Sequence, residues 1–190
     1  MTHHHSAPAN PSRSPRISTA DQTGRFGGPA APRPHTDAEL AAVIGLLTSG
    51  RPRVETVVIG HGRDDVSRAT ARAFAEAWQA RGGAVLGQVD WPEDAASWLR
   101  PARRLTAQIP DAWVIAAAVL GFAQLARRLR HSTDFDPART VAFAALDDPR
   151  LPALAGPGTL DGLRGATADG GTWDIHDGWI TSRQRTEPSG

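Results

Sequence analysis

The stretch from residue 54 to residue 89 constrains the fold more than any other part of this 190-residue chain. Residues 54–59 are rich in β-branched side chains, which predicts a strand. A Gly/Asp turn then leads into a predicted helix over residues 67–81, and a glycine pair separates that helix from a second predicted strand over residues 84–89. This order predicts a β-α-β unit, whose connection is expected to be right-handed.

The rest of the chain continues the alternation of helices and strands. Thr36 and Glu39 form a capping-box pattern ahead of a helix. After the β-α-β unit we expect a helix from residue 97 or 98 with Trp98, Ala102, Leu105 and Ile109 inward, a strand over 112–118, a helix over 121–130, a strand over 140–146, a short helix over 151–155, a strand over 163–167, and a hairpin over 172–182 with its turn at Asp177-Gly178.

These elements predict a three-layer α/β domain of the flavodoxin-like or Rossmann-like kind. The sheet should be mostly parallel, with four or five strands in the order 2-1-3-4-5 and helices on both faces. By composition we divide the chain into a Pro/Ser/Arg-rich disordered segment (1–35), a ligand-binding-type lobe (36–170), a hairpin extension (171–182) and a disordered tail (183–190).

Composition excludes several kinds of chemistry. The chain has no Cys and no Lys, and its 21 basic residues are all Arg, so it offers no thiolate nucleophile, no disulfide and no Schiff-base or phosphate-loop lysine. The net charge is +1, and the arginine clusters lie on predicted helices without interleaved aromatic residues, so we expect no nucleic-acid partner. We also expect no cofactor and no bound metal.

The chain carries no pattern for membrane insertion. Its longest apolar run, residues 112–122, falls well short of the ~20 residues of a spanning helix. Residues 1–35 contain neither an apolar signal-peptide core nor a lipid-attachment Cys. For the chain as given, the expectation is therefore either a cytoplasmic protein or a mature fragment.

The candidate site follows from the topology, because ligands of open α/β sheets bind beyond the carboxyl ends of the strands. The residues placed there, and expected to bind a ligand, are Gly60, His61, Asp64, Asp65, Trp91, Asp147 and Asp148. The glycines are not a dinucleotide fingerprint, because Asp65 stands where that motif has its third glycine.

Each of these side chains also has a purely structural interpretation. His61 is either a general base or a histidine that hydrogen-bonds nearby backbone. Asp147 and Asp148 either bind a cation or ligand ammonium, or cap the turn before Pro149. Trp91 can stack on a ligand or pack in the core.

The order of these landmarks resembles the second lobe of type I periplasmic solute-binding proteins, the amino-acid receptors of ABC transporters. The residues that carry the resemblance are the capped helix HTDAELAAVIGLL, the unit VVIGHGRDDVSRATARAFAEAWQARGG followed by AVLGQVDWP, the segments LTAQIPDAWVIAA, FAQLARRLRH and TVAFAALDD, and the late run from Leu160 to Ala166. They cover about residues 36–170.

The resemblance implies a two-lobed clamp that closes over a small ligand. In that family this lobe supplies an aromatic residue after the turn of strand one, where this chain has Asp65-Val66-Ser67, and an acidic residue after strand four, which Asp147 or Asp148 would provide. The first lobe and the export signal of the family are missing from this sequence.

Three functions are compatible with these observations. The first is a non-enzymatic domain that binds a small polar molecule such as an amino acid, as a sensor or accessory module. The second is a small α/β enzyme that uses His61 and an aspartate of the same rim. The third is a vestigial lobe whose open face is covered by a protein partner or by a second copy in a homodimer.

Overall fold

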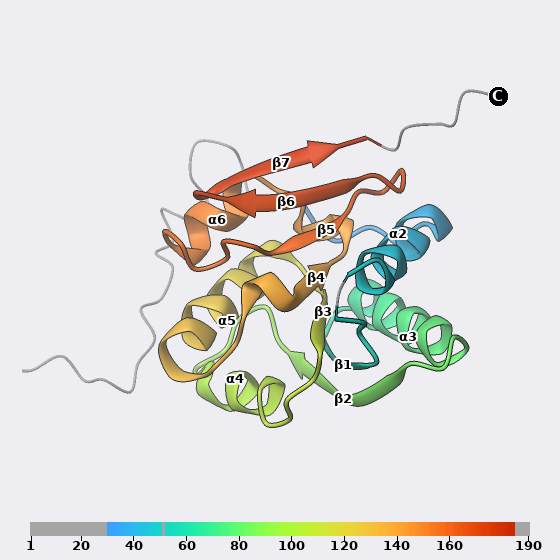
Figure 1. Cartoon of the computed structure of the whole chain (residues 1–190). Helices are drawn as coiled ribbons and strands as arrows, with labels where there is room; N and C mark the ends of the chain where they lie inside the picture. Colours follow the sequence, from blue (N-terminus) through green and yellow to red (C-terminus); the bar gives the residue numbers. More distant parts are fainter. Residues whose placement is uncertain (1–29, 51, 185–190) are drawn as a thin grey trace, which may run out of the picture.

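A computed structural model describes residues 30–50 and 52–184 as an α/β domain built on one seven-stranded sheet (Figure 1). The strand order is β2-β1-β3-β4-β5-β6-β7, and the first five strands are parallel. The predicted order 2-1-3-4-5 and the α/β fold class are confirmed, and the hairpin β6-β7 extends the sheet in antiparallel fashion.

The elements of the described chain follow one another in the predicted alternation. In chain order they are α2 (Asp37–Thr48), β1 (Thr56–Gly62), α3 (Asp65–Gln79), β2 (Ala84–Trp91), α4 (Leu99–Leu105), β3 (Ala112–Ala116), α5 (Val119–Ser132), the 3-10 turn η1 (Pro137–Arg139), β4 (Thr140–Ala142), the 3-10 turn η2 (Ala144–Leu146), α6 (Arg150–Ala155), β5 (Arg164–Ala166), β6 (Thr172–His176) and β7 (Trp179–Arg183). None of the described helices is long and apolar enough to cross a membrane.

Helices cover both faces of the parallel sheet (Figure 1). Because side chains alternate along a strand, Val57 and Ile59 of β1 pack with α2 and α3, whereas Val58 packs with α4 and α5. The central strands are therefore buried on both sides, as their continuous apolar runs predict.

Several predicted element boundaries differ from the structure, among them the ends of β1, β2 and β4. β1 and β2 run on to Gly62 and Trp91, because the two strands keep pairing in parallel register up to that residue pair. This pairing overrides the glycines that suggested a loop from Gly60. β4 ends at Ala142, and the next residues form the turn η2 instead of more strand.

The predicted inward position of Ile109 is also wrong. Helix α4 ends at Leu105, and Ile109 is 88% exposed. Pro110 disfavours helical backbone in the residue before it, so the helical spacing cannot extend to Ile109.

The predicted capping box of α2 is present, and its Glu39 side chain also accepts a hydrogen bond from outside the helix. Thr36 Oγ1 accepts a hydrogen bond from Glu39 N at 3.0 Å, and Glu39 Oε2 accepts one from Thr36 N at 3.4 Å. The second oxygen, Glu39 Oε1, accepts a hydrogen bond from Ala144 N in η2 at 2.6 Å. Residues 30–35, the last of the predicted disordered segment, lead into this cap without regular secondary structure; its first 29 residues lie outside the described part.

The hairpin β6-β7 turns at Asp177 and Gly178, as predicted. Both residues have positive φ, 50° and 76°, which matches the backbone of a tight hairpin turn. The buried Trp173 of β6 lies against Gly165 of β5 and donates a hydrogen bond from Nε1 to Ala166 O at 3.0 Å. The Trp173 ring therefore packs the hairpin onto the sheet, and it fits there because Gly165 has no side chain.

Replacement of this glycine should lower stability. A Cβ at Gly165 would overlap both the Trp173 ring and the backbone oxygen of Ala142. We expect Gly165→Ala to reduce the free energy of unfolding by about 1–3 kcal/mol, as overpacked sites do. The matched control is Gly45→Ala on α2, where the added methyl meets nothing within 4 Å and should stabilise the helix by about 0.5–1 kcal/mol. Urea unfolding of both variants measures this, and equal shifts in the two would contradict it.

Candidate functional site

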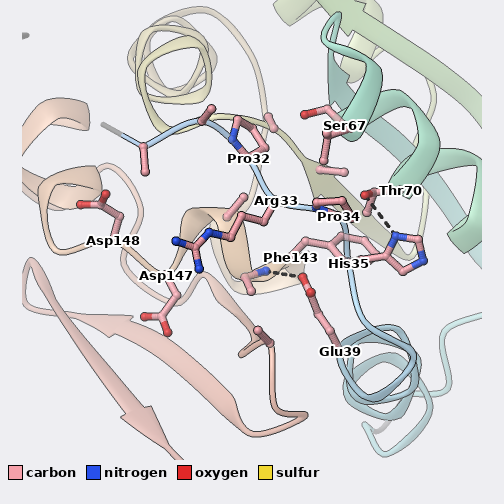
Figure 2. Close-up of a pocket in the computed structure, with 18 residues that line it drawn as sticks. Pro32, Arg33, Pro34, His35, Glu39, Ser67, Thr70, Phe143, Asp147 and Asp148 are labelled. Carbon is pink, nitrogen blue, oxygen red and sulfur yellow. Dashed lines mark hydrogen bonds between the residues drawn. The ribbon is translucent and has the colours of Figure 1, made fainter. Parts of the chain in front are cut away.

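A pocket of about 280 Å³ lies at the carboxyl edge of β3 and β4 (Figure 2). Its floor comes from the ends of these strands, and its sides come from the first turns of α3, from the segment after β4 and from residues 30–35. The polar side chains that line it are those of Arg33, His35, Glu39, Ser67, Thr70, Asp147 and Asp148. The pocket therefore lies where the topology predicts a ligand site.

Asp147 and Asp148, two of the predicted site residues, line this pocket but differ in their surroundings. Asp148 is paired with Arg150, whose Nη2 lies 2.6 Å from Oδ2, and this guanidinium holds the pKa of Asp148 below its usual range. Asp147 accepts a hydrogen bond from Ser182 Oγ at 3.1 Å and has no ion pair within the described ranges. Asp148 is thus paired with a cation of the chain, whereas Asp147 has only the Ser182 hydroxyl as a hydrogen-bond partner in the described part.

The pKa of Asp147 is raised. Burial of its carboxyl is the main cause, and the negative charges of Asp148 and Asp169 raise the pKa further, while the Ser182 hydroxyl lowers it. Burial and the neighbouring acids thus disfavour the ionised form of Asp147, and a bound cationic group would stabilise that form.

Ser67 and Thr70 project from the first turns of α3 toward the pocket (Figure 2). Ser67 is only 2% exposed, and its Oγ has no hydrogen-bond partner among the described residues. Thr70 Oγ1 lies 3.3 Å from His35 Nδ1. The Ser67 hydroxyl lies next to Gly62, where an added Cβ would be 3.2 Å from its Oγ, and so near the carboxylates of Asp64 and Glu93.

The sequence prediction missed Arg33, His35, Glu39, Ser67 and Thr70 as pocket residues. The helix that follows the first strand was a usable signal for Ser67 and Thr70, because its first turns meet the ligand crevice in such sheets. Nothing in the sequence predicts that Arg33 and His35 line the pocket, because the Pro-rich composition of their segment predicts disorder.

Three of the predicted site residues lie in the sheet and not in the pocket. Trp91 is fully buried in the core against Phe122, and a Cβ on Gly60 would touch the Trp91 ring. His61 is a strand residue whose Nδ1 lies 2.8 Å from Gly62 O, so its ring bonds adjacent backbone. These positions serve the packing of β1 and β2.

The two other predicted residues, Asp64 and Asp65, belong to the start of α3. Asp64 is the N-cap, and its Oδ1 accepts a hydrogen bond from Ser67 N at 2.8 Å. Asp65 has a side chain that is 97% exposed and pairs with Arg68. The structure thus assigns them to helix capping and to the surface, outside the pocket lining.

A second carboxylate caps the neighbouring helix α5. Glu93 Oε2 accepts a hydrogen bond from Gly121 N at 2.9 Å, and a Cβ built on Gly62 would lie 3.3 Å from Glu93 Oε1 and 2.7 Å from Asp64 Oδ2. Glu93 is an exposed residue, yet partial desolvation of its carboxyl raises the pKa, the hydrogen bond from Gly121 N lowers it, and the charge of Asp64 raises it.

The carboxyl ends of β1 and β3, where α3 and α5 diverge to opposite faces, therefore already hold two carboxylates, those of Asp64 and Glu93. An anionic ligand there would meet negative charge at both helix starts. Among the described residues, no group of three or more His, Cys, Asp or Glu side chains could hold a metal ion. The His3-His4-His5 run lies outside those residues.

Asp147 and Asp148 should have opposite effects on stability. The pKa of Asp147 is raised by folding, so its ionisation destabilises the fold, and Asp147→Asn should stabilise the protein above that pKa and have no effect below it. The pKa of Asp148 is lowered by folding, so Asp148→Asn should destabilise the protein above the unfolded value of about 3.9, and the difference should vanish as pH falls through the folded value.

Because both side chains are partly exposed, we expect each effect to stay below about 1 kcal/mol. Urea unfolding of the two variants and the unmodified chain, across a pH series from neutral to acid, measures both signs. Changes of the same sign in the two variants at neutral pH would contradict the assigned environments.

Comparison with known proteins relates this geometry to solute receptors. No protein-family model and no curated protein matches the sequence. Among solved structures, a putative branched-chain amino acid ABC transporter protein from Rhodospirillum rubrum is 24% identical with a TM-score of 0.58, and the match covers 68% of this chain and 36% of that one. A leucine-binding protein from Thermotoga maritima is 19% identical with a TM-score of 0.56, covering 69% and 37%.

A third similar structure is a solute-binding protein from Rhodopseudomonas palustris in complex with 3,4-dihydroxybenzoic acid. It is 12% identical with a TM-score of 0.54, and the match covers 66% of this chain and 34% of that one. Each match thus spans little more than a third of the solved protein, which corresponds to one of two lobes. The chain has the fold of one lobe of a type I periplasmic solute-binding protein.

Proposed function

We propose that this chain is a non-enzymatic domain that binds a small polar molecule, such as an amino acid, in the pocket at the carboxyl edge of β3 and β4. The observation that carries the proposal is Asp147, an acid in the pocket wall with a raised pKa and without a cationic partner in the described chain. A ligand ammonium or amide would supply the missing partner.

Three further features support this proposal. The pocket is small, close to the lower end of the range of about 300–1,000 Å³ for ligand sites. It combines polar side chains such as Thr70 with apolar walls from Phe143 and alanines. Proteins of the same fold include a leucine-binding protein and a complex with an aromatic acid. We further propose that the domain acts as a sensor or accessory module.

The alternative of an enzyme at His61 has less support. The histidine bonds the neighbouring backbone and lies outside the pocket lining, away from Asp147 and Asp148. The similar structures named above are solute-binding or transporter proteins by their descriptions. A protein partner or a homodimer on the open face stays a prediction.

A thermal-shift screen tests the proposed function. The panel holds amino acids, short amides, sugars, aromatic acids and nucleotides, and a ligand at about 100 times its Kd adds roughly 2.7 kcal/mol, or several degrees in Tm. We expect one class to raise the Tm. That shift should be lost in Asp147→Asn and kept in Glu76→Gln, which changes an exposed acid of α3.

Two results would count against this function. The first is a panel that leaves the Tm of the unmodified chain unchanged throughout. The second is a ligand whose shift survives in Asp147→Asn at full size, because such a ligand binds elsewhere on the domain.

A further inference from the structure

We propose that the carboxyl end of β1 binds a hard divalent cation, Mg²⁺ or Ca²⁺, through one oxygen each of Asp64, Ser67 and Glu93. This cation site goes beyond the proposed function, and of its three residues only Ser67 also lines the pocket at β3 and β4. The observation that carries it is that three oxygens without a hydrogen-bond partner in the described chain surround the same space beside Gly62.

The three oxygens converge on the place where another residue would carry its Cβ. Asp64 Oδ2 lies 2.7 Å from a Cβ position built on Gly62. Ser67 Oγ lies 3.2 Å and Glu93 Oε1 lies 3.3 Å from the same position. Because glycine has no side chain, this space is open to an ion, and a cation somewhat farther from the backbone would have the three oxygens around it.

Both carboxylates are held in place by the helices that they cap. Asp64 Oδ1 accepts a hydrogen bond from Ser67 N at the start of α3, and Glu93 Oε2 accepts one from Gly121 N in the first turn of α5. The other oxygen of each carboxylate faces the space beside Gly62. Carboxylates that bind metal ions are typically oriented in this way, by a hydrogen bond from a second group.

Two of the three oxygens are buried without a hydrogen bond. Asp64 Oδ2 and Ser67 Oγ are closed to solvent and have no partner among the described residues. Ser67 as a whole is only 2% exposed, so its hydroxyl cannot turn to bulk water instead. Buried polar atoms in native proteins nearly always have a protein, water or ion partner, so a bound species is expected here.

The charge of the cluster favours a cation. Neither Asp64 nor Glu93 forms an ion pair within the described ranges, and desolvation and the charge of Asp64 raise the pKa of Glu93. The starts of α3 and α5 carry about half a positive charge each, which offsets only part of two carboxylates. A water molecule would satisfy the hydrogen bonds but leave this negative charge, whereas a divalent cation compensates it.

The ligand atoms favour Mg²⁺ or Ca²⁺ over transition metals. All three are oxygens, and the adjacent His61 uses Nδ1 for a contact of 2.8 Å with Gly62 O. Carboxylate, hydroxyl and water oxygens are the ligands that hard cations prefer. Three protein oxygens are fewer than a closed cage requires, so water molecules complete the coordination, as they commonly do around Mg²⁺.

Titration of the full chain with MgCl₂ or CaCl₂ tests the proposal, after treatment with EDTA and dialysis. Binding is followed by calorimetry and by Tm, with choline chloride of equal ionic strength as the control for screening of surface charge. We expect a Kd of about 0.1–1 mM and a Tm that rises with cation concentration. These two cations also avoid the His3-His4-His5 run, because imidazoles prefer transition metals.

Four variants separate ligands from neighbours. Asp64→Asn keeps an N-cap, and Glu93→Gln keeps an oxygen for Gly121 N, yet each should weaken cation binding about tenfold to a hundredfold. Ser67→Ala should weaken binding less, because it removes a neutral ligand. The matched control is Asp65→Asn, which removes the same charge from a side chain that is 97% exposed and should bind like the unmodified chain.

The cation-free protein gives a second readout. In EDTA, Asp64→Asn and Glu93→Gln should unfold at the same Tm as the unmodified chain or at a higher one, because each removes one of two neighbouring negative charges. With Mg²⁺ or Ca²⁺ the order should reverse, because only the unmodified chain keeps both carboxylate ligands. Loss of a cap alone would lower the Tm with and without the cation.

Two results would overturn the cation site. One is the absence of any binding heat or change in Tm with either cation at about 10 mM, ten times the weakest expected Kd. The other is an equal loss of binding in Asp65→Asn, because the cation would then only screen surface charge. Either result leaves the proposed function standing, since the thermal-shift screen of the pocket uses organic ligands.

Discussion

The pocket depends on one buried carboxylate, that of Glu39. It is only 4% exposed, and its two oxygens join parts of the chain that are far apart in sequence, the start of α2 at Thr36 and the turn after β4 at Ala144. Burial raises the pKa of Glu39, and the two backbone hydrogen bonds lower it in partial compensation. Through these two hydrogen bonds, Glu39 ties the residue that follows the segment 30–35 to the turn after β4.

A second feature of the site is the position of the carboxylates at the carboxyl edge of the sheet. Asp64 caps α3 and Glu93 caps α5, so the helix starts that could attract an anion are already neutralised by the chain. Asp147 and Arg33 face the adjacent pocket.

Sequence predicts the fold better than the site, for physical reasons. The β-α-β unit, the strand order and the hairpin at Asp177-Gly178 depend on local patterns and on general rules of chain connection, and the structure confirms them. Gly60 and Trp91 were misplaced because pairing between β1 and β2 decides where those strands end. Residues 30–35 join the pocket through His35, which contacts Thr70 and Phe143, two residues remote in sequence.

The central claim is that ligand binds at the carboxyl edge of β3 and β4, against residues 30–35. Amide chemical-shift mapping of the full chain during titration with a mixture of L-amino acids tests it most directly. The account predicts that the largest shift changes cluster at Arg33, His35, Ser67, Ala144 and Asp147. Shift changes centred on Gly62 and Glu93, at the carboxyl end of β1, or no shift changes at all, would contradict this claim.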